Sequence, residues 1–352
     1  MLPSFAQWLD ESSFRWLEKA LGVAPESIQI VTGGKNNRGL QVVANGRPYF
    51  VKQYFDDDCH RFHRETAFTK LLQKHQVGAV AQLIDCRGAS ELGGEESEIA
   101  IFSHLSGQLP NEICISAKQD VYIQQVANFI ASVNQDVVSQ DASHLLPARG
   151  GLSLAAEFIR EIQRRMQSLF SLEVENVSDL ETPLYESMRE WLKTVFEPAF
   201  RRVEKQVMHD FGDDLHAPFE RVLSPSDIGF HNTLLDSETD TLSFFDFEYS
   251  GWDSAEKLVT DFFAQPRFEL HAHWIASFCE IAFPKQPNLV ERCTSLLPLS
   301  HLKWALIFLN EFKHPDDERR LFASKHQEER NNAFKRKQQQ LDKARHRVAR
   351  AE

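Results

Sequence analysis

Acidic and amide side chains recur in segment 224–252 at a spacing that suits phosphate chemistry. Asp227 and Asn232 stand five positions apart, as D-x₄-N, and Asp246 closes the second of two strand-like runs that follow. Phosphoryl transfer from a nucleotide requires a phosphate clamp, a group that orients the attacking hydroxyl, and two ligands for Mg²⁺. The chain offers a candidate for each of these parts, in a plausible order. The elements that carry them can be predicted from the flanking residues.

Lys52 lies in the run 49–54, whose aromatic and β-branched residues predict a strand. Period-two alternation places it on the same face as Phe50 and Tyr54. Thirteen residues later, Glu65 falls on the apolar stripe of a predicted helix. Because burial of either charge alone costs several kcal/mol, we expect Lys52 and Glu65 to pair, with the lysine head directed at phosphate oxygens. A merely structural ion pair is the alternative.

Glycines stand between the first two predicted strands, at Gly33-Gly34 and again at Gly39. The backbone N–H groups of such a turn can bind phosphate, and Gly39 allows a close approach of the chain. The spacing does not match G-x-G-x-x-G, so an ordinary hairpin is the alternative.

The order of these features resembles the protein-kinase-like superfamily, in its aminoglycoside phosphotransferase and choline kinase branch. A glycine turn, a strand lysine, a helix glutamate, D-x₄-N and a later aspartate follow one another in the chain. The segment 246–251, Asp-Phe-Glu-Tyr-Ser-Gly, is similar to the metal-binding segment of choline and ethanolamine kinases. The resemblance covers about residues 27–265.

The resemblance implies a role for each matching position. Asp227 would accept the proton of the substrate hydroxyl or orient it, Asn232 would bind Mg²⁺, and Asp246 would bridge Mg²⁺ to the nucleotide phosphates. Lys52 and Glu65 would be the phosphate-binding lysine and its helix partner. The turn at Gly33 and Gly34 would lie over the nucleotide.

Three further positions bear on this assignment. Pro225 stands where the family usually has a histidine, two residues before the catalytic aspartate. Since that histidine supports the loop, its replacement concerns the geometry of the loop more than its chemistry. His231 can replace part of the lost hydrogen bonding or can have a plain structural role. Glu248 is expected to be an additional metal or water ligand, with an exposed loop carboxylate as the alternative.

Strand-like patterns dominate the first hundred residues and helical patterns the rest. The predicted strands are 28–32, 40–44, 47–55, 80–85 and 98–102, followed by one β-rich interruption at 222–247. The predicted helices are 4–21, 60–74, 117–135, 152–170, 181–208, 254–264, 270–282 and 298–312. This order predicts an α+β, protein-kinase-like fold with a β-rich N-lobe and a mostly helical C-lobe. The predicted division is 1–103 for the N-lobe, 104–313 for the C-lobe and 314–352 for a charged tail.

The tail is almost entirely polar. Phe334, Leu341 and Val348 recur every seven positions, which is too sparse for a stable coiled coil. We therefore expect a solvated helix or a frayed tail, with a partner-binding arm as the alternative.

Composition excludes several classes of protein. The formal net charge of −12 disfavours nucleic-acid binding, and no apolar run approaches the roughly 20 residues that span a bilayer. The N-terminus lacks the pattern of a secretory signal, and the five scattered cysteines suit reduced thiols, so a cytoplasmic location is expected. The oligomeric state is not indicated.

The residues and the resemblance together predict an ATP- and Mg²⁺-dependent phosphotransferase. Its acceptor would be a small hydroxyl compound such as a sugar, an amino sugar or an amino alcohol like choline. A catalytically inactive, nucleotide-binding regulatory module is the alternative. A protein kinase is disfavoured because no A-P-E segment follows Asp246. A group of aromatic residues offers either an acceptor pocket or simple core packing: Tyr249, Trp252, Phe262, Phe263 and Trp274.

Overall fold

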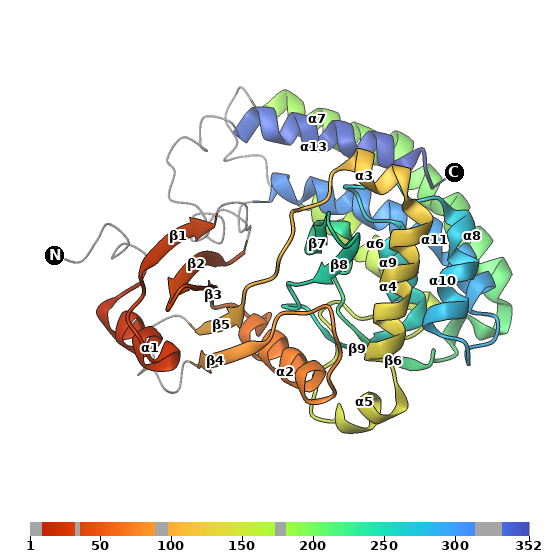
Figure 1. The fold of residues 1–352 in the computed structure, drawn as a ribbon. Helices are drawn as coiled ribbons and strands as arrows, with labels where there is room; N and C mark the ends of the chain where they lie inside the picture. The colour runs from red at the N-terminus through yellow and green to blue at the C-terminus, as the bar shows by residue number, and fades with distance from the viewer. Residues whose placement is uncertain (1–8, 32–35, 89–97, 173–180, 314–332, 352) are drawn as a thin grey trace.

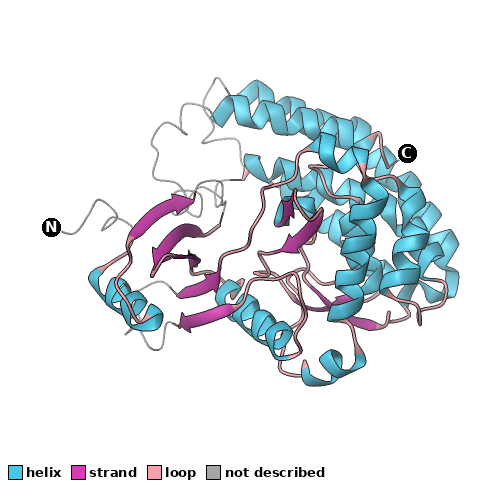
Figure 2. Ribbon diagram, viewed as in Figure 1, coloured by secondary structure: helices cyan, strands magenta, loops and turns pink. Residues whose placement is uncertain are grey.

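The computed structural model describes residues 9–31, 36–88, 98–172, 181–313 and 333–351. Its five-stranded sheet lies at one side and most of its helices at the other, where two short strand pairs lie among them, as Figure 2 shows. This arrangement confirms the predicted α+β, two-lobed fold. Strand β5 ends at Ser103, and Glu112 begins the first helix of the second lobe. The domain boundaries at 103 and 313 stay predictions.

The N-lobe is built on a five-stranded antiparallel sheet with the order β1-β2-β3-β5-β4. The strands are β1 (Ser27–Val31), β2 (Arg38–Ala44), β3 (Arg47–Gln53), β4 (Leu83–Arg87) and β5 (Ile99–Ser103). Asn45 and Gly46 join β2 to β3 with φ values of 50° and 67°, as a two-residue type I′ turn requires. The predicted hairpin is therefore confirmed.

Two helices cover opposite faces of this sheet, α1 (Glu11–Leu21) and α2 (Arg61–Lys74) (Figure 1). The side chain of Asp10 caps α1, which begins later than the predicted residue 4. The α1 face holds Val51 and its neighbours, and Phe50 packs in the cluster on the α2 face. Strand alternation therefore directs Lys52, two positions after Phe50, toward α2 as well.

The C-lobe is mostly helical. Its helices are α3 (Glu112–Ala117), α4 (Gln119–Val133), α5 (Asp136–Asp141), α6 (Ala155–Phe170), α7 (Thr182–Trp191), α8 (Glu197–Phe211), α9 (Ala255–Phe263), α10 (Ile275–Ala282), α11 (Leu289–Phe308) and α13 (Ala333–Val348). A π-helical turn, Leu192–Phe196, joins α7 to α8, so the long helix predicted at 181–208 is nearly continuous. None of the described helices combines the length and the apolar character that crossing a bilayer would need.

Two small antiparallel pairs interrupt these helices. Strand β6 (Arg221–Ser224) pairs with β9 (Gly251–Ser254), and β7 (Thr233–Asp236) pairs with β8 (Thr241–Phe244). The predicted interruption at 222–247 contains three of these strands, whereas β9 was not predicted.

The chain enters the C-lobe close to β7. Gln108 and Leu235 exchange two backbone hydrogen bonds, at 3.0 and 2.8 Å. Gly107 has a φ of 105°, and a Cβ there would lie 2.7 Å from the Leu235 oxygen, so this close approach requires glycine. The connection between the lobes is thereby fastened to the hairpin that carries the candidate site.

Helix α13 packs into the core of the C-lobe beside α11 and α7 (Figure 1). Leu341 and Ala344 are fully buried, and Val348 is 3% exposed. The prediction of a solvated or frayed tail is therefore wrong for residues 333–351, although the helix is present. The heptad repeat understates the apolar stripe of α13, because the small residue Ala344 is also buried there, where α13 packs against α11.

Candidate active site

The β7–β8 hairpin brings Asn232 and Asp246 together. Asn232 directly precedes β7 and Asp246 follows the end of β8, while the register pairs Thr233 with Phe244. Both residues therefore stand at the same open end of the hairpin. The backbone N–H of Phe245 donates to the Asn232 carbonyl oxygen at 3.2 Å, which extends the pairing by one step.

Lys52 and Glu65 form the predicted ion pair. The Lys52 Nζ lies 2.7 Å from Glu65 Oε2, and the two side chains are 10% and 6% exposed. Tyr54, on the same strand face as Lys52, donates its hydroxyl to the same carboxylate oxygen at 2.8 Å. The N–H of Phe247 donates to Glu65 Oε1 at 3.3 Å. Glu65 on α2 therefore holds both the strand lysine and the segment that contains Asp246.

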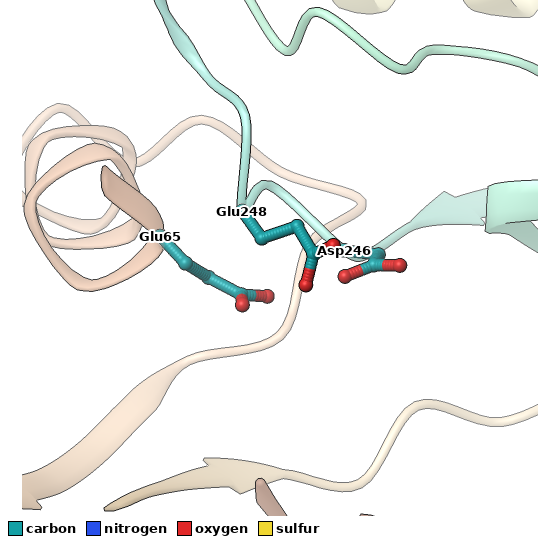
Figure 3. Close-up of side chains that lie close together, drawn as sticks. All are labelled: Glu65, Asp246 and Glu248. Atoms are coloured by element: carbon teal, nitrogen blue, oxygen red, sulfur yellow. The ribbon is translucent and has the colours of Figure 1, made fainter. Parts of the chain in front are cut away.

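The same lysine contacts two further carboxylates. Its Nζ lies 2.5 Å from Asp246 Oδ1 and 3.4 Å from Glu248 Oε2. Carboxylate oxygens of Glu65, Asp246 and Glu248 lie within 4.8 Å of one another, and Figure 3 shows the three side chains converging. Burial lowers the pKa of Lys52, but the three carboxylates outweigh it and the pKa is raised well above its ordinary value. Lys52 is therefore charged at neutral pH.

Glu248 is 2% exposed, so the alternative of an exposed loop carboxylate is wrong. The Asn36 amide donates to its Oε1 at 2.6 Å, and the Asn37 amide donates to its Oε2. The Nε of Arg61, whose side chain is fully buried, lies 3.3 Å from Oε1. Burial and Asp246 raise the pKa of Glu248, against the opposing effect of Lys52 and Arg61. Glu248 thus joins the end of the β1–β2 turn to helix α2 and to the hairpin segment.

Asp227 lies in the loop between β6 and β7. Its Oδ1 is 3.3 Å from His231 Nε2, and the Asn232 amide donates to its backbone oxygen at 2.9 Å. Burial raises the pKa of Asp227, but the His231 contact outweighs this and the net shift is downward. The side chain is 37% exposed. Asp227 is therefore an ionised carboxylate that a ligand in solution can reach.

Asn232 is oriented by this contact. Because its Nδ2 donates to Asp227, its Oδ1 is the atom left to bind something else, and no residue in the described part of the chain donates to it. Burial lowers the pKa of the preceding residue, His231, but the Asp227 contact and the charge of Asp246 act against it and the net shift is upward. Lys52 thus contacts Asp246, the backbone of the adjacent Phe245 bonds to Asn232, and Asn232 bonds to Asp227.

Some predicted residues lie elsewhere or outside the described residues. Gly33 and Gly34 are among the residues that the structure does not describe. Gly39 lies opposite Lys52 in the sheet, and a Cβ there would meet the Phe50 ring at 3.0 Å. Phe262 and Phe263 are fully buried in the core, so the acceptor-pocket interpretation is wrong for these two.

Several residues at the site were not predicted. Asn36 and Asn37 follow the glycine turn, and that position was the only available signal. Arg61 begins α2, and its helical spacing from Phe68 and Leu72, on the stripe that also holds Glu65, was the signal that was missed. Gln265, after α9, accepts a hydrogen bond from the backbone of the loop that carries Asp227 and had no signal at all.

The chain matches the model of a phosphotransferase enzyme family, APH, over residues 27–256. Solved structures with a similar fold include a spectinomycin phosphotransferase, APH(9)-Ia, in complex with ADP and spectinomycin. It is 13% identical, with a TM-score of 0.57 and coverage of 95% of this chain and 97% of that one. An ethanolamine kinase from Plasmodium vivax is 15% identical, with a TM-score of 0.54 and coverage of 90% and 82%.

A choline/ethanolamine kinase family protein from Mesorhizobium loti is 14% identical, with a TM-score of 0.55 and coverage of 92% of each chain. No curated protein sequence matches the chain significantly. The solved structures confirm the kinase-like fold, and the family model spans both the Lys52–Glu65 pair and the segment from Asp227 to Glu248. On this match, the chain belongs to the phosphotransferase enzyme family.

Proposed function

We propose that this protein transfers the γ-phosphoryl group of ATP, bound with Mg²⁺, to a hydroxyl group of a small molecule. The observation that carries the proposal is that one hairpin end gathers Lys52, Asp246, Asn232 and Asp227: Lys52 contacts Asp246, the adjacent Phe245 backbone bonds to Asn232, and Asn232 bonds to Asp227. A cation that binds phosphate, oxygen ligands for a metal and an accessible carboxylate are the parts that phosphoryl transfer needs. The spectinomycin phosphotransferase of similar fold is described as an ADP complex, which supports an adenine nucleotide here.

The residues present fit Mg²⁺. Asp246 offers a carboxylate that is 33% exposed, and Asn232 offers an amide oxygen that accepts no hydrogen bond from the described residues. Both are hard oxygen ligands of the kind that Mg²⁺ takes together with substrate phosphates. The metal, when bound, would neutralise charge on the phosphate oxygens. Glu248 is committed to Arg61 and two asparagines, so we assign it to holding the site together and not to direct metal binding.

The chain's own residues then have separate tasks. Lys52, fixed by Glu65, would donate to phosphate oxygens of the nucleotide. Asp227 would accept a hydrogen bond from the acceptor hydroxyl and receive its proton, which requires the ionised state that its lowered pKa provides. Asn232 would keep Asp227 in place through its Nδ2 while its Oδ1 faces the metal. Catalysis would thus rest on positioning and charge neutralisation.

Two variants test the proposal, Asp227→Asn and Asp246→Asn, with Asp213→Asn as an exposed control. Purified proteins would be mixed with radiolabelled ATP, Mg²⁺ and a panel of sugars, amino sugars and amino alcohols. We expect wild type and Asp213→Asn to label an acceptor, and the other two variants to lose at least about 100-fold in kcat, because each removes a group that acts in the transition state. Full transfer activity in Asp227→Asn would refute its role.

Thermal shift with ATP and Mg²⁺ separates the proposal from the alternative of an inactive regulatory module. Both readings predict that nucleotide raises the Tm, since a ligand that binds the folded state stabilises it. Only the phosphotransferase reading predicts a labelled product. Binding without transfer to any acceptor, with GTP tested in parallel, would favour the inactive module.

A further inference from the structure

The loop that carries Asp227 is held from outside the segment that the family model matches. The backbone N–H of Phe230, which lies between Asp227 and Asn232, donates to Gln265 Oε1 at 3.1 Å. Both residues are buried, at 0% and 1% exposed. A buried N–H without an acceptor costs about 1–3 kcal/mol, so this bond constrains where the loop backbone can lie.

The loop is built to let Gln265 approach. A Cβ at Gly229 would lie 2.9 Å from Gln265 Oε1 and 2.6 Å from ring atoms of His231. Only glycine leaves room for the glutamine oxygen and the imidazole together. The imidazole, folded against this position, is the one whose Nε2 faces Asp227 at 3.3 Å. Gln265 therefore supports the loop at the point where His231 turns back toward the carboxylate.

Gln265 is itself fixed by the C-terminal helix. Its backbone oxygen accepts a hydrogen bond from Arg347 Nη2 at 3.2 Å. Arg347 is 6% exposed and forms no short ion pair with a described carboxylate, although the charge of Glu269 acts on it. Its charge lies just beyond the end of α9, where free carbonyl groups and the helix dipole favour a cation. Arg347 on α13 thus caps the segment that presents Gln265.

Helix α9 is anchored on its other side by buried ion pairs. Lys257 Nζ lies 2.9 Å from Asp261 Oδ2 and 3.2 Å from Asp253 Oδ2, and Lys303 of α11 also contacts Asp261. All four side chains are at most 13% exposed. The Arg347 hydrogen bond and these ion pairs therefore fix both Gln265 and the helix α9 that precedes it.

We infer that Gln265 is a positioning residue for the catalytic loop, and that Arg347 of the C-terminal helix holds it in place. The inference rests on the proposed function, since it gives the loop a catalytic task. Displacement of a reacting group by about 1 Å can lower a rate on the order of 100-fold. Loss of the Gln265 contact should therefore lower kcat while leaving the nucleotide clamp at Lys52 and Glu65 unaffected.

The first test compares Gln265→Met, which keeps the length and loses the acceptor, with Gln265→Glu, which keeps an acceptor oxygen. Within the described ranges the Gln265 Nε2 has no hydrogen-bond partner, so its replacement by oxygen removes none of the contacts seen there. We expect Gln265→Met to lower kcat by about 10- to 100-fold with an unchanged KM for ATP, and Gln265→Glu to recover most of it. Wild-type kcat in Gln265→Met would overturn the inference. So would a parallel loss of kcat, ATP affinity and Tm in both variants, because that pattern means general support of the fold.

The second test compares two arginines of α13. Arg347→Met should lower kcat several-fold with the KM for ATP unchanged. Arg345→Met should leave kcat unchanged, since the described residues that Arg345 contacts are Asp342 and Ser187 at the surface. Equal kcat values in the two variants would overturn the part assigned to Arg347.

Amide hydrogen exchange at Phe230 gives a readout that does not depend on turnover. Gln265→Met should accelerate exchange of this amide, whereas exchange in the sheet of the N-lobe should not change. If the wild type transfers no phosphate but Gln265→Met still accelerates exchange of the Phe230 amide, the proposed function fails and the contact between Phe230 and Gln265 stands. Unchanged exchange in Gln265→Met would refute the contact itself.

Discussion

Replacement of Lys52 by methionine is the most direct test of the charge cluster at the site. Methionine preserves most of the volume of the side chain and removes the cation that faces Glu65, Asp246 and Glu248 at 2.7, 2.5 and 3.4 Å. The three carboxylates, with oxygens within 4.8 Å of one another, would then repel one another in a largely buried site. The variant should therefore lose stability as well as activity.

The magnitude follows from the burial of the pair. Removal of one partner from a buried ion pair costs about 3–5 kcal/mol, because it leaves an uncompensated charge. We expect a loss in this range at pH 8. At pH 5.5 the loss should be smaller, since crowded carboxylates have raised pKa values and take up protons in the folded state. The folded variant then binds more protons than the unfolded chain, so its stability decreases as pH rises.

Urea denaturation at both pH values measures the effect through the midpoint at a common slope. The matched control is Lys118→Met, whose ammonium lies 2.8 Å from Asp240 in an exposed pair worth at most about 1 kcal/mol. Mg²⁺ without nucleotide should stabilise Lys52→Met more than wild type, because the ammonium that competes with the metal for Asp246 is gone. If Lys52→Met loses no more stability than Lys118→Met, the electrostatic account of the cluster is wrong.

Three further predictions concern the core and its buried polar groups. Leu341→Ala should cost about 2–5 kcal/mol of unfolding free energy if α13 is packed as described, and an unchanged urea midpoint would contradict this. Tyr54→Phe should cost about 1–3 kcal/mol, because the hydroxyl donates to the charged Glu65 at 2.8 Å; a cost below the error of the denaturation curves would contradict it. Burial, with Arg347 and a second arginine nearby, lowers the pKa of His301 to about 3, so the unfolded chain binds the proton more readily between about pH 6.5 and 3. Wild type should therefore lose about 2 kcal/mol between pH 7.5 and 5 through this group, and His301→Gln should lose correspondingly less in paired urea titrations.

Much of the fold and part of the site could be predicted because the relevant signals are local. Alternation along β3 is enough to place Lys52 on one face of the strand, and helical periodicity is enough to place Glu65 on the buried stripe of α2. The Asn45-Gly46 pair predicts a tight hairpin because both positions need positive φ. Each of these inferences uses residues within one or two elements, where the repeat of the strand or helix determines which side chains share a face.

The support of the catalytic loop could not be predicted in this way. Gln265 lies 35 positions from Phe230, and Arg347 lies 82 positions from Gln265. No periodic pattern links them. Arg347 lies in a polar stretch and looks like a surface residue, and Gln265 follows an apolar run but carries no charge that would call for a buried partner. The burial of α13 was also missed, since counting large apolar residues alone left out Ala344.

A comparison of two buried cations explains where prediction from sequence ends. Lys52 and Arg61 have side chains that are 10% and 0% exposed, so the arginine is the more deeply buried of the two. Lys52 could be identified because its neighbours in the strand are apolar, which makes a charge among them conspicuous. Arg61 shares the helical stripe of Glu65, but His60, His63 and Arg64 surround it in the sequence, and Glu248, the carboxylate that compensates its charge between the lobes, is 187 positions away. A buried charge is therefore predictable when its own element is apolar, whereas one that is buried by a distant partner becomes evident only in the folded structure. Contacts between the lobes depend on such distant partners. The chemical groups proposed for this site could therefore be predicted from the sequence, whereas the residues that hold them together could not.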